Sequence, residues 1–357
     1  MTSICLNMIV KNESRIIDRC IAALVDVVDC YVICDTGSTD DTVERIEKRF
    51  LAAGIPGEIH HTEFRNFAQA RNEALDAAYG SALTYDYLLM CDADMELVVR
   101  DRAWKTSLTA PAYSLMQRSM QGGLEYGNIR MVRRDVFARY VGVTHEYLDV
   151  GPVDVPKLTV VDYLDHAEGS SRFEKFDRDV RLLTEALQHE PDNARYAFYL
   201  ANSYFDAGNW EEALGWYRKR AAMGGWVEEV FMAKYRAGIC YEKMERFSDF
   251  YRLLLETGDE HPDRAEPLHV LAIHAQRENR HRLALWLARI GLTIPKPGAI
   301  LFVEAEVYEW RLLDIVAVSL YWLDQRDEAA RLNKQLLNLV PPQEKPRILE
   351  NLAFCGG

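Results

Sequence analysis

The stretch Tyr85-Asp86-Tyr87-Leu88-Leu89-Met90-Cys91-Asp92-Ala93-Asp94-Met95 decides how the rest of the chain is interpreted. Its middle, residues 87–91, predicts a short apolar strand that ends in two carboxylates one residue apart. Open α/β sheets bind their ligands at the carboxyl ends of strands, and carboxylate oxygens suit Mg²⁺ or Mn²⁺. An Asp-x-Asp (DxD) pair alone is common and also fits an acidic turn, so its meaning depends on its surroundings.

Two strand–helix units precede this stretch. The apolar run at residues 4–10 predicts a strand that is buried on both faces. Apolar residues at helical spacing follow between residues 16 and 24. A second strand, residues 30–34, runs into a turn with a glycine and then a helix. This order predicts half of a doubly wound, nucleotide-binding sheet.

The pattern of predicted strands and helices changes around the acidic pair. A weak strand at residues 57–62 and an alanine-rich helix at residues 68–79 come before it. Short strand-like pieces separated by turn residues come after it, at residues 112–116, 129–132, 137–141 and 158–163. We expect antiparallel strands and loops here, which would shape the side of the site that receives a second substrate.

The second half of the chain has the pattern of a helical repeat. Its first small residues, Ala201, Gly238 and Ala272, are 37 and 34 residues apart, close to the ~34 of tetratricopeptide repeats. Such repeats stack into a solenoid with a concave surface. We therefore predict two domains, residues 1–170 and residues 171–357.

Composition narrows the class of protein. The chain has 357 residues, 49% of them hydrophobic, and a net charge of −13, so nucleic acid is not the expected partner. No apolar run is long enough for a transmembrane helix, and the N-terminus does not have the pattern of a signal peptide. Seven cysteines without a Cys-x-x-Cys pair favour reduced core thiols over a zinc site. We expect a cytoplasmic protein.

Several pieces of the sequence together resemble a known family. They resemble family 2 glycosyltransferases of the type-A fold, in particular members that carry tetratricopeptide repeats behind the catalytic domain. The matching pieces occur in the family's order, at residues 6–13, 32–40, 66–72, 89–94 and 144–146. The resemblance implies an α/β nucleotide-diphospho-sugar transferase domain with a Rossmann-like mixed sheet, followed by an all-α tetratricopeptide solenoid.

The resemblance also implies a metal-dependent, inverting, hexosyltransferase-type reaction. Mn²⁺ or Mg²⁺ would stabilise the charge on the leaving diphosphate. Asp94 would ligate the metal, and Asp92 would face the ribose or a metal-bound water. His166 would complete the metal shell, although its match to the family is imperfect, and a histidine at the domain junction is the alternative. Arg71 would reach the diphosphate, or else pair with Asp92 or Glu73.

The same resemblance assigns the donor pocket. It favours a UDP-sugar over a guanosine donor. Asp35, at the end of the second predicted strand, would accept the N–H of the uracil ring. Val10 and Asn12, at the end of the first, would line the base pocket. No Gly-x-Gly-x-x-Gly motif or P-loop is present in the sequence.

An inverting displacement needs a general base on the acceptor side. Glu146, in the sequence Thr144-His145-Glu146, is the predicted base, and Asp149 is the second choice. His145 would orient Glu146 or act as the base itself. The alternative is that His145 and Glu146 form an ion pair in a surface turn.

Three functions therefore compete. The first is an inverting glycosyltransferase whose repeats bind the acceptor or a partner. The second is a non-catalytic, peptide-binding repeat protein with a degenerate transferase domain. The third, a nucleotidyltransferase, lacks its expected glycine-rich loop here. For the enzyme, a peptide or protein and an envelope polysaccharide or lipid-linked sugar are the candidate acceptors, and the repeats could instead form a homodimer.

Overall fold

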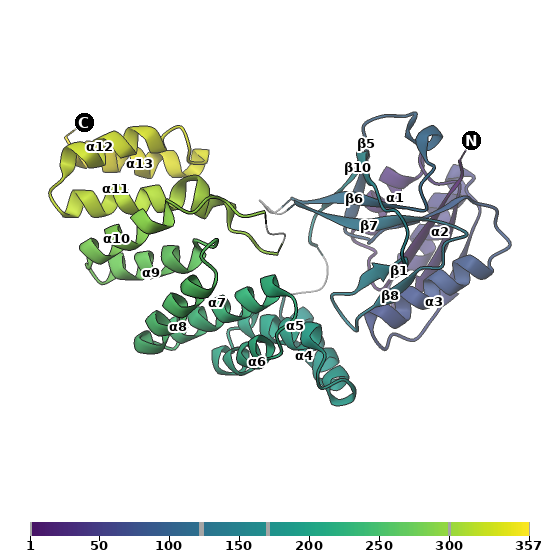
Figure 1. Ribbon diagram of the computed structural model, residues 1–357. Helices are drawn as coiled ribbons and strands as arrows, with labels where there is room; N and C mark the ends of the chain where they lie inside the picture. The colour runs from purple at the N-terminus through teal and green to yellow at the C-terminus, as the bar shows by residue number, and fades with distance from the viewer. Residues whose placement is uncertain (1, 121–124, 169–171, 299–300, 357) are drawn as a thin grey trace. The chain divides into compact units, whose positions relative to one another are not determined.

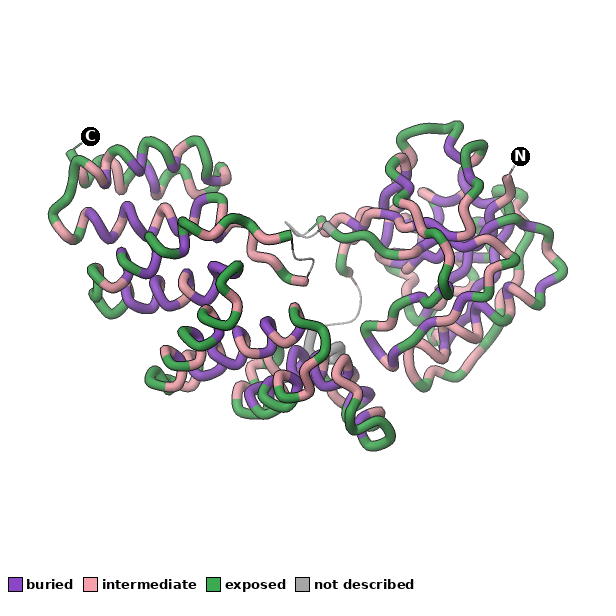
Figure 2. The backbone as a smooth tube through the Cα atoms, in the orientation of Figure 1, coloured by how far each residue is buried: buried purple, intermediate pink, exposed green. Residues whose placement is uncertain are grey.

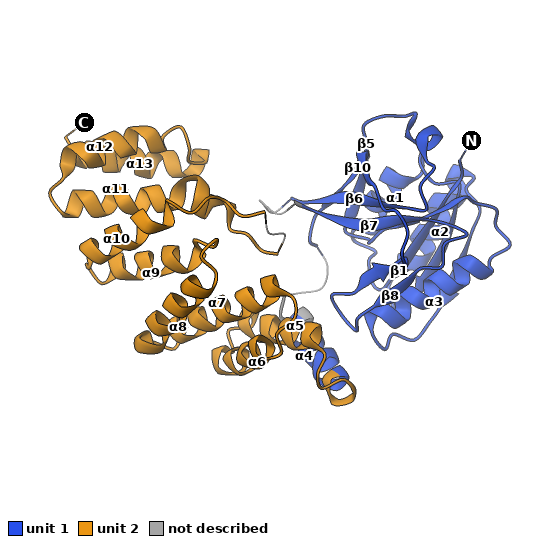
Figure 3. Cartoon of the chain, viewed as in Figure 1, with its two compact units in different colours: residues 1–186 blue, residues 187–357 orange. Residues whose placement is uncertain are grey.

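The chain folds into two compact units (Figure 3). The computed structural model describes residues 2–120, 125–168, 172–298 and 301–356. The units comprise residues 1–186 and 187–357, and the division falls inside helix α4 (Arg172–His189). The predicted boundary between residues 170 and 171 lies outside the described residues.

Strands and helices alternate through the first part of unit 1, as the sequence predicts (Figure 1). The continuous apolar runs of β1 and β2 become strands buried on both faces, because helices cover both sides of the sheet. The elements of this unit before α4 are β1 (Ile4–Val10), α1 (Ile17–Leu24), β2 (Cys30–Asp35), α2 (Thr42–Ala53), β3 (Gly57–His61), α3 (Phe67–Gly80), β4 (Tyr87–Met90), β5 (Met95–Val99), the 3₁₀ turn η1 (Trp104–Ser107), β6 (Ala112–Ser119), β7 (Glu125–Arg133), β8 (Arg139–Val141), β9 (Tyr147–Asp149) and β10 (Lys157–Asp165).

One mixed sheet organises unit 1. Its eight strands run in the order β3-β2-β1-β4-β7-β6-β10-β5. The first four are parallel to one another, whereas β7 pairs antiparallel with both β4 and β6. The carboxyl ends of β1, β2 and β4 therefore meet at the same edge of the sheet, where ligands of such folds bind.

The two faces of this sheet have separate cores. Helices α1 and α2 contribute Ile21 and Phe50 to a core that includes Leu6 of β1. Helix α3 contributes Leu75 to the core on the other face, which includes Cys5 of the same strand. Alternate residues of β1 thus point into different cores, as the period of two in a strand requires.

Two strands were not predicted from the sequence. Strand β5 begins directly after the acidic pair and pairs antiparallel with β10, some sixty residues later in the chain. Strand β9 forms a small separate ribbon with β8. The acidic pair consequently lies in a tight turn between two strands, β4 and β5.

Unit 2 consists of antiparallel helix pairs that share one core. Figure 2 shows its buried residues along the facing sides of the helices. All seven cysteines of the chain are free thiols. None of the helices within the described residues is long and apolar enough to cross a membrane. The elements that follow α4 are α5 (Ala194–Asp206), α6 (Trp210–Ala222), α7 (Val227–Lys243), α8 (Phe247–Glu260), α9 (Glu266–Arg277), α10 (His281–Gly291), the π-helical turn η2 (Val307–Arg311), α11 (Leu312–Trp322), α12 (Arg326–Leu336), the 3₁₀ turn η3 (Pro342–Glu344) and α13 (Lys345–Phe354).

The small residues of the repeat pattern lie where paired helices approach closely. Ala201 and Ala272 are fully buried in the core of unit 2. At Gly238 in α7, an added Cβ would lie 2.4 Å from a methyl group of Leu254 in α8. The predicted reason for small residues at these positions, close helix packing, is therefore confirmed at Gly238.

Candidate functional site

Three predicted site residues lie at the carboxyl edge of the parallel strands. Val10 and Asp35 are paired as the last residues of β1 and β2. Asp92 follows β4, two residues after Met90, which pairs with β1. His166 follows β10, and its backbone N–H donates to the carbonyl oxygen of Asp94 at 3.1 Å. The fold therefore gathers residues that are more than 150 positions apart in the sequence.

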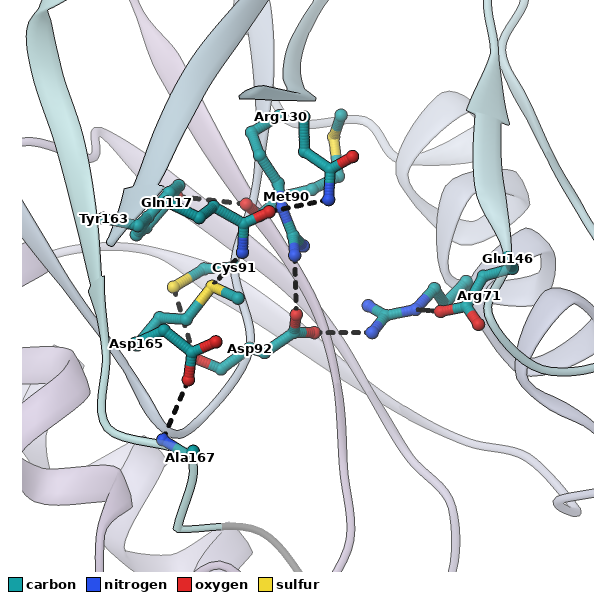
Figure 4. Close-up of polar contacts among 12 residues, drawn as sticks. Arg71, Met90, Cys91, Asp92, Gln117, Arg130, Glu146, Tyr163, Asp165 and Ala167 are labelled. Carbon is teal, nitrogen blue, oxygen red and sulfur yellow. Dashed lines mark hydrogen bonds and ion pairs between the residues drawn. The ribbon is translucent and has the colours of Figure 1, made fainter. Parts of the chain in front are cut away.

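Asp92 lies between two guanidinium groups (Figure 4). Arg71 of α3 donates to one carboxylate oxygen at 2.6 Å, and Arg130 of β7 lies 3.0 Å from the other. Burial alone would raise the pKa of Asp92, but the two arginines outweigh burial and hold that pKa below its usual range. Asp92 is consequently a permanent anion that anchors both cations.

Arg71 also holds the predicted base. Its Nε donates to Glu146 at 2.6 Å, and its guanidinium lies 5.4 Å from the centre of the Tyr140 ring. One side chain thus joins Asp92 and Glu146, whose carboxylates are largely buried. Of the ion pairs considered for Arg71, the pair with Asp92 is present, while Glu73 pairs with Arg65 at 3.1 Å.

The pKa of Asp94, the second carboxylate of the acidic pair, is shifted in the opposite direction from the pKa of Asp92. Burial, followed by the charges of Asp92 and Asp165, raises the pKa of Asp94 to about 6. Burial and the charges of Asp94, Asp40 and Asp92 likewise raise the pKa of Glu13 to about 7. A cation would relieve this mutual repulsion, so the carboxylates fit a divalent metal on electrostatic grounds.

The geometry limits what the protein itself could offer to such a metal. Across the described ranges, no three His, Cys, Asp or Glu side chains converge as a ligand group. The ring of His166 lies 3.2 Å from a carboxylate oxygen of Glu96. A metal at Asp94 would take most of its ligands from phosphate oxygens and water, which is the usual way that Mg²⁺ is bound.

The turn after β2 is built around Asp35. Its carboxylate accepts the backbone N–H of Ser38 at 3.0 Å and lies 3.2 Å from Nδ1 of His61. Asn12, after β1, has a left-handed backbone with φ of 55°, and its side-chain oxygen accepts the N–H of Thr39 at 2.7 Å. Asp35 and Asn12 therefore fix two adjacent loops at the predicted donor pocket.

The three candidates for the general base lie in different surroundings. Glu146 contacts the Arg71–Asp92 group through Nε of Arg71. His145 lies 3.7 Å from Asp179 of α4. Asp149 is exposed at the end of β9 and accepts the N–H of Gly151. Geometry thus favours Glu146 as the carboxylate that belongs to the site.

The sequence did not reveal Arg130 as part of the site. It lies in the apolar strand β7, is buried, and its Nε has no hydrogen-bond partner within the described parts of the chain. An arginine within an apolar strand is costly to bury unless it is paired. The cost of burying an arginine could have revealed Arg130 from the sequence, because it implies an acidic partner on a neighbouring strand.

Comparison with known proteins supports the interpretation of both units. Residues 5–99 match the model of the family described as Glycosyl transferase family 2. A TPR repeat-containing protein of Synechococcus elongatus is 32% identical over 158 residues, which is 42% of this chain and 36% of that protein. The SPbeta prophage-derived glycosyltransferase SunS of Bacillus subtilis is 25% identical over 232 residues, which is 61% of this chain and 53% of SunS.

Two solved structures show some likeness to this chain. MamA is 19% identical, with a TM-score of 0.37 over 49% of this chain and 86% of that one. YrrB, described as a TPR protein with an unusual peptide-binding site, is 15% identical, with a TM-score of 0.37 over 50% of this chain and 84% of that one. The chain spans roughly a third to a half of the length of its two curated relatives. Residues 5–99 thus match the model of a glycosyl transferase family 2 domain, and helix pairs with the small-residue spacing of tetratricopeptide repeats follow it in the chain.

Proposed function

We propose that this protein transfers a sugar from a nucleotide-sugar donor, with a UDP-sugar favoured, to a hydroxyl or other nucleophile, with inversion and with a divalent metal. The observation that carries this proposal is the Arg71 bridge. It brings Asp92 and Glu146 together beside Asp94, at the edge of the sheet where β1 and β2 end. The glycosyltransferase among the relatives supports the reaction class.

The donor would lie across the ends of β1, β2 and β4. Asp35 would accept the uracil N–H, and Val10 and Asn12 would border the base. The carboxylate of Asp35 is already held by backbone amides of its turn, which would keep it oriented for this contact. Arg71 would turn from its carboxylates towards the diphosphate.

The leaving group needs stabilisation of charge. Mn²⁺ or Mg²⁺, when bound, would neutralise charge on the diphosphate. Asp94 would hold the ion directly, with His166 as a further ligand, and Asp92 would face the ribose or a metal-bound water. The buried Nε of Arg130, which has no hydrogen-bond partner among the described residues, would be available to an oxygen of the donor.

The transfer itself is a single displacement. The bond between the anomeric carbon and the phosphate oxygen breaks, and a bond from that carbon to the acceptor oxygen forms. The proton of the acceptor hydroxyl passes to Glu146, and the nucleoside diphosphate leaves with the electron pair. His145 would help to orient Glu146. A peptide or protein acceptor is compatible with the helical repeats, as is a polysaccharide.

The experiment is a titration of the purified chain with UDP and UDP-sugars, with and without Mn²⁺. We expect calorimetry to detect binding that requires the metal. Asp94→Ala should abolish the metal dependence, whereas Glu146→Gln should keep binding and lose turnover by about a hundredfold or more, the usual range for a general base. Asp149→Asn is the matched control and should keep both.

Three outcomes would contradict the proposal in different ways. Loss of turnover in Asp149→Asn alone would transfer the role of base to Asp149. Metal-dependent binding that survives in Asp94→Ala would remove Asp94 from the metal site. If no nucleotide or nucleotide-sugar binds, the alternative function, that of a non-catalytic, peptide-binding repeat protein, is favoured instead.

A further inference from the structure

Unit 2 contains a segment that leaves the helices and returns against earlier ones. Residues 301–306 are the last part of the connection between α10 and η2 (Figure 1). The side chains that they meet belong to α5 and α7, which are the first helices of two successive pairs. We call this surface the α5–α7 face, and it comprises Phe198, Asn202, Glu228, Tyr235 and Arg236.

Two hydrogen bonds hold the segment to α7. The backbone N–H of Leu301 donates to a carboxylate oxygen of Glu228 at 2.7 Å. The hydroxyl of Tyr235 donates to Oε1 of Glu304 at 2.8 Å. These partners are 73 and 69 positions apart in the sequence, so the contact is a tertiary one that crosses helix pairs.

An aromatic ring lies between these two bonds. The Phe302 ring stacks on Phe198 of α5, with centroids 6.5 Å apart and planes at 24°. The guanidinium of Arg236 lies 5.0 Å from the centre of the same ring. The face thus receives a backbone amide, a ring and a carboxylate in order, which is the pattern by which extended peptides are recognised.

The segment is held less firmly than the helices around it. Phe302 has a left-handed backbone with φ of 48°, which is unfavourable for a bulky residue. Its ring remains 38% exposed. Besides the Tyr235 hydroxyl, the carboxylate of Glu304 has a cation, Arg311, at 3.7 Å. Strain and partial exposure mark this segment as one that opens before the core does.

The α5–α7 face is itself fixed independently of the segment. Tyr235 is buried. Arg236 donates to the side-chain oxygen of Asn202 at 2.7 Å, and the same oxygen accepts from Tyr217 at 2.7 Å. Release of residues 301–304 would leave these groups in place, so the face is organised in advance for an incoming ligand.

We propose that the α5–α7 face binds an extended peptide of a partner protein and that residues 301–304 occupy this site in the free protein. The partner segment carries an aromatic residue followed two positions later by a carboxylate, as Phe302 and Glu304 do. Peptide and segment compete for the same groups, so occupation by the segment lowers the apparent affinity for the partner. The proposal does not depend on transferase activity.

A peptide with the sequence of residues 301–306, Leu-Phe-Val-Glu-Ala-Glu, labelled with fluorescein, tests this competition. Fluorescence anisotropy would compare the full-length wild-type chain with the Phe302→Ala/Glu304→Gln variant. We expect the variant to bind the peptide at least tenfold more tightly, because its own segment no longer fills the face. Glu309→Gln, which removes an exposed carboxylate paired with Lys296, is the matched control and should bind like wild type.

A second substitution shows whether the peptide uses the same face. Adding Tyr235→Phe to the double variant removes only a hydroxyl and should reverse most of the gain in affinity. Equal binding to wild type and to the double variant would overturn occupation by residues 301–304. A gain in affinity that Tyr235→Phe leaves intact would overturn the α5–α7 face as the site.

Hydrogen exchange on the wild-type chain gives a readout that needs no variant. Saturating peptide should increase exchange of the Leu301 amide, whose hydrogen bond to Glu228 would be lost. Unchanged exchange at Leu301 despite bound peptide would contradict the competition directly.

Discussion

Asp92 neutralises two buried arginines, and this sets the cost of removing its charge. Asp92→Asn keeps the shape of the side chain but leaves Arg130 without a carboxylate partner, while Glu146 still pairs with Arg71. Breaking a buried ion pair from one side costs about 3–5 kcal/mol. We expect the free energy of unfolding to fall by about 3 kcal/mol in urea denaturation.

An exposed carboxylate provides the comparison. Asp135 pairs with Arg133 at the surface, and Asp135→Asn should leave the urea midpoint unchanged, because water screens such pairs. If both variants lost the same stability, the burial of the Asp92 cluster would not be the cause.

The raised pKa values of Asp94 and Glu13 predict a dependence of stability on pH. Both pKa values, about 6 and about 7, lie above those of the unfolded chain, so the folded state binds more protons between about pH 4 and pH 7. These groups should therefore lower stability as pH rises through that window. Because one unit of pKa is about 1.4 kcal/mol and water screens part of it, we expect a loss of roughly 2 kcal/mol.

Urea denaturation at several pH values would measure this slope. Asp94→Asn together with Glu13→Gln should flatten it. Asp92 contributes little to the slope above about pH 5, because its pKa is lowered in the folded state and the stability that it contributes is lost only as pH falls below about 5. A slope that persists in the double variant would assign it to other groups.

At the residue level, the sequence predicted where the charged groups lie better than it predicted which groups they pair with. Asp35 and Asp92 follow apolar strands, and strand ends at one edge of a parallel sheet come together. Which carboxylate pairs with Arg71 depends on where α3 and the loop before β9 lie in the folded chain. The sequence does not show this, so it left Asp92 and Glu73 as alternatives. Arg130 was missed because β7 pairs with β4 only through tertiary structure.

Among the elements, α7 and α8 offer a sharp test of packing. Gly238→Ala would place a Cβ within 2.4 Å of the buried Leu254 side chain, and overpacking of a core typically costs about 1–3 kcal/mol. We expect the melting temperature of the variant to fall. Gly215→Ala in α6, where nothing lies within 4 Å of the new Cβ, should instead be neutral or stabilising by up to ~1 kcal/mol.

The melting temperatures of these two alanine variants distinguish the effect of packing from the effect of helix propensity. Propensity favours alanine at both positions, so only packing can separate them. Equal melting temperatures for Gly238→Ala and Gly215→Ala would mean that α7 and α8 adjust without cost, and that a small residue at position 238 is not required.

Elements with strong local patterns were predictable, and those that depend on distant partners were not. Strand β1 and helix α3 have clear apolar periodicity and were predicted within about one residue. Strand β5 is short and exists because β10 pairs with it. The partner strand of β5 is therefore not encoded nearby in the sequence, and β5 itself was not predicted.

On the scale of the whole molecule, two units that share no core predict two unfolding events. Unit 1 has cores on both faces of its sheet, and unit 2 has its own. We expect calorimetry of the full chain to show two transitions, because cores of this kind unfold as separate cooperative units. Gly238→Ala should shift only the transition of unit 2, and UDP with Mn²⁺ should raise only that of unit 1.

A single transition that both changes move together would contradict independent units.

The change from a strand–helix pattern to continuous helices was visible in the sequence and predicted two architectures correctly. The division between the two units, between residues 186 and 187, falls inside helix α4.

The Arg71 bridge has a consequence for how the two ends of the site communicate. One guanidinium cannot fully serve Asp92, Glu146 and a diphosphate at once. A nucleotide that draws Arg71 away would leave the carboxylate of Glu146 free to bind the acceptor hydroxyl, and an acceptor bound to Glu146 would in turn release Arg71 to the nucleotide. Thermodynamic linkage requires these two effects to be equal in size. The effect of donor on acceptor binding and that of acceptor on donor binding would then be one coupling energy, carried by one side chain.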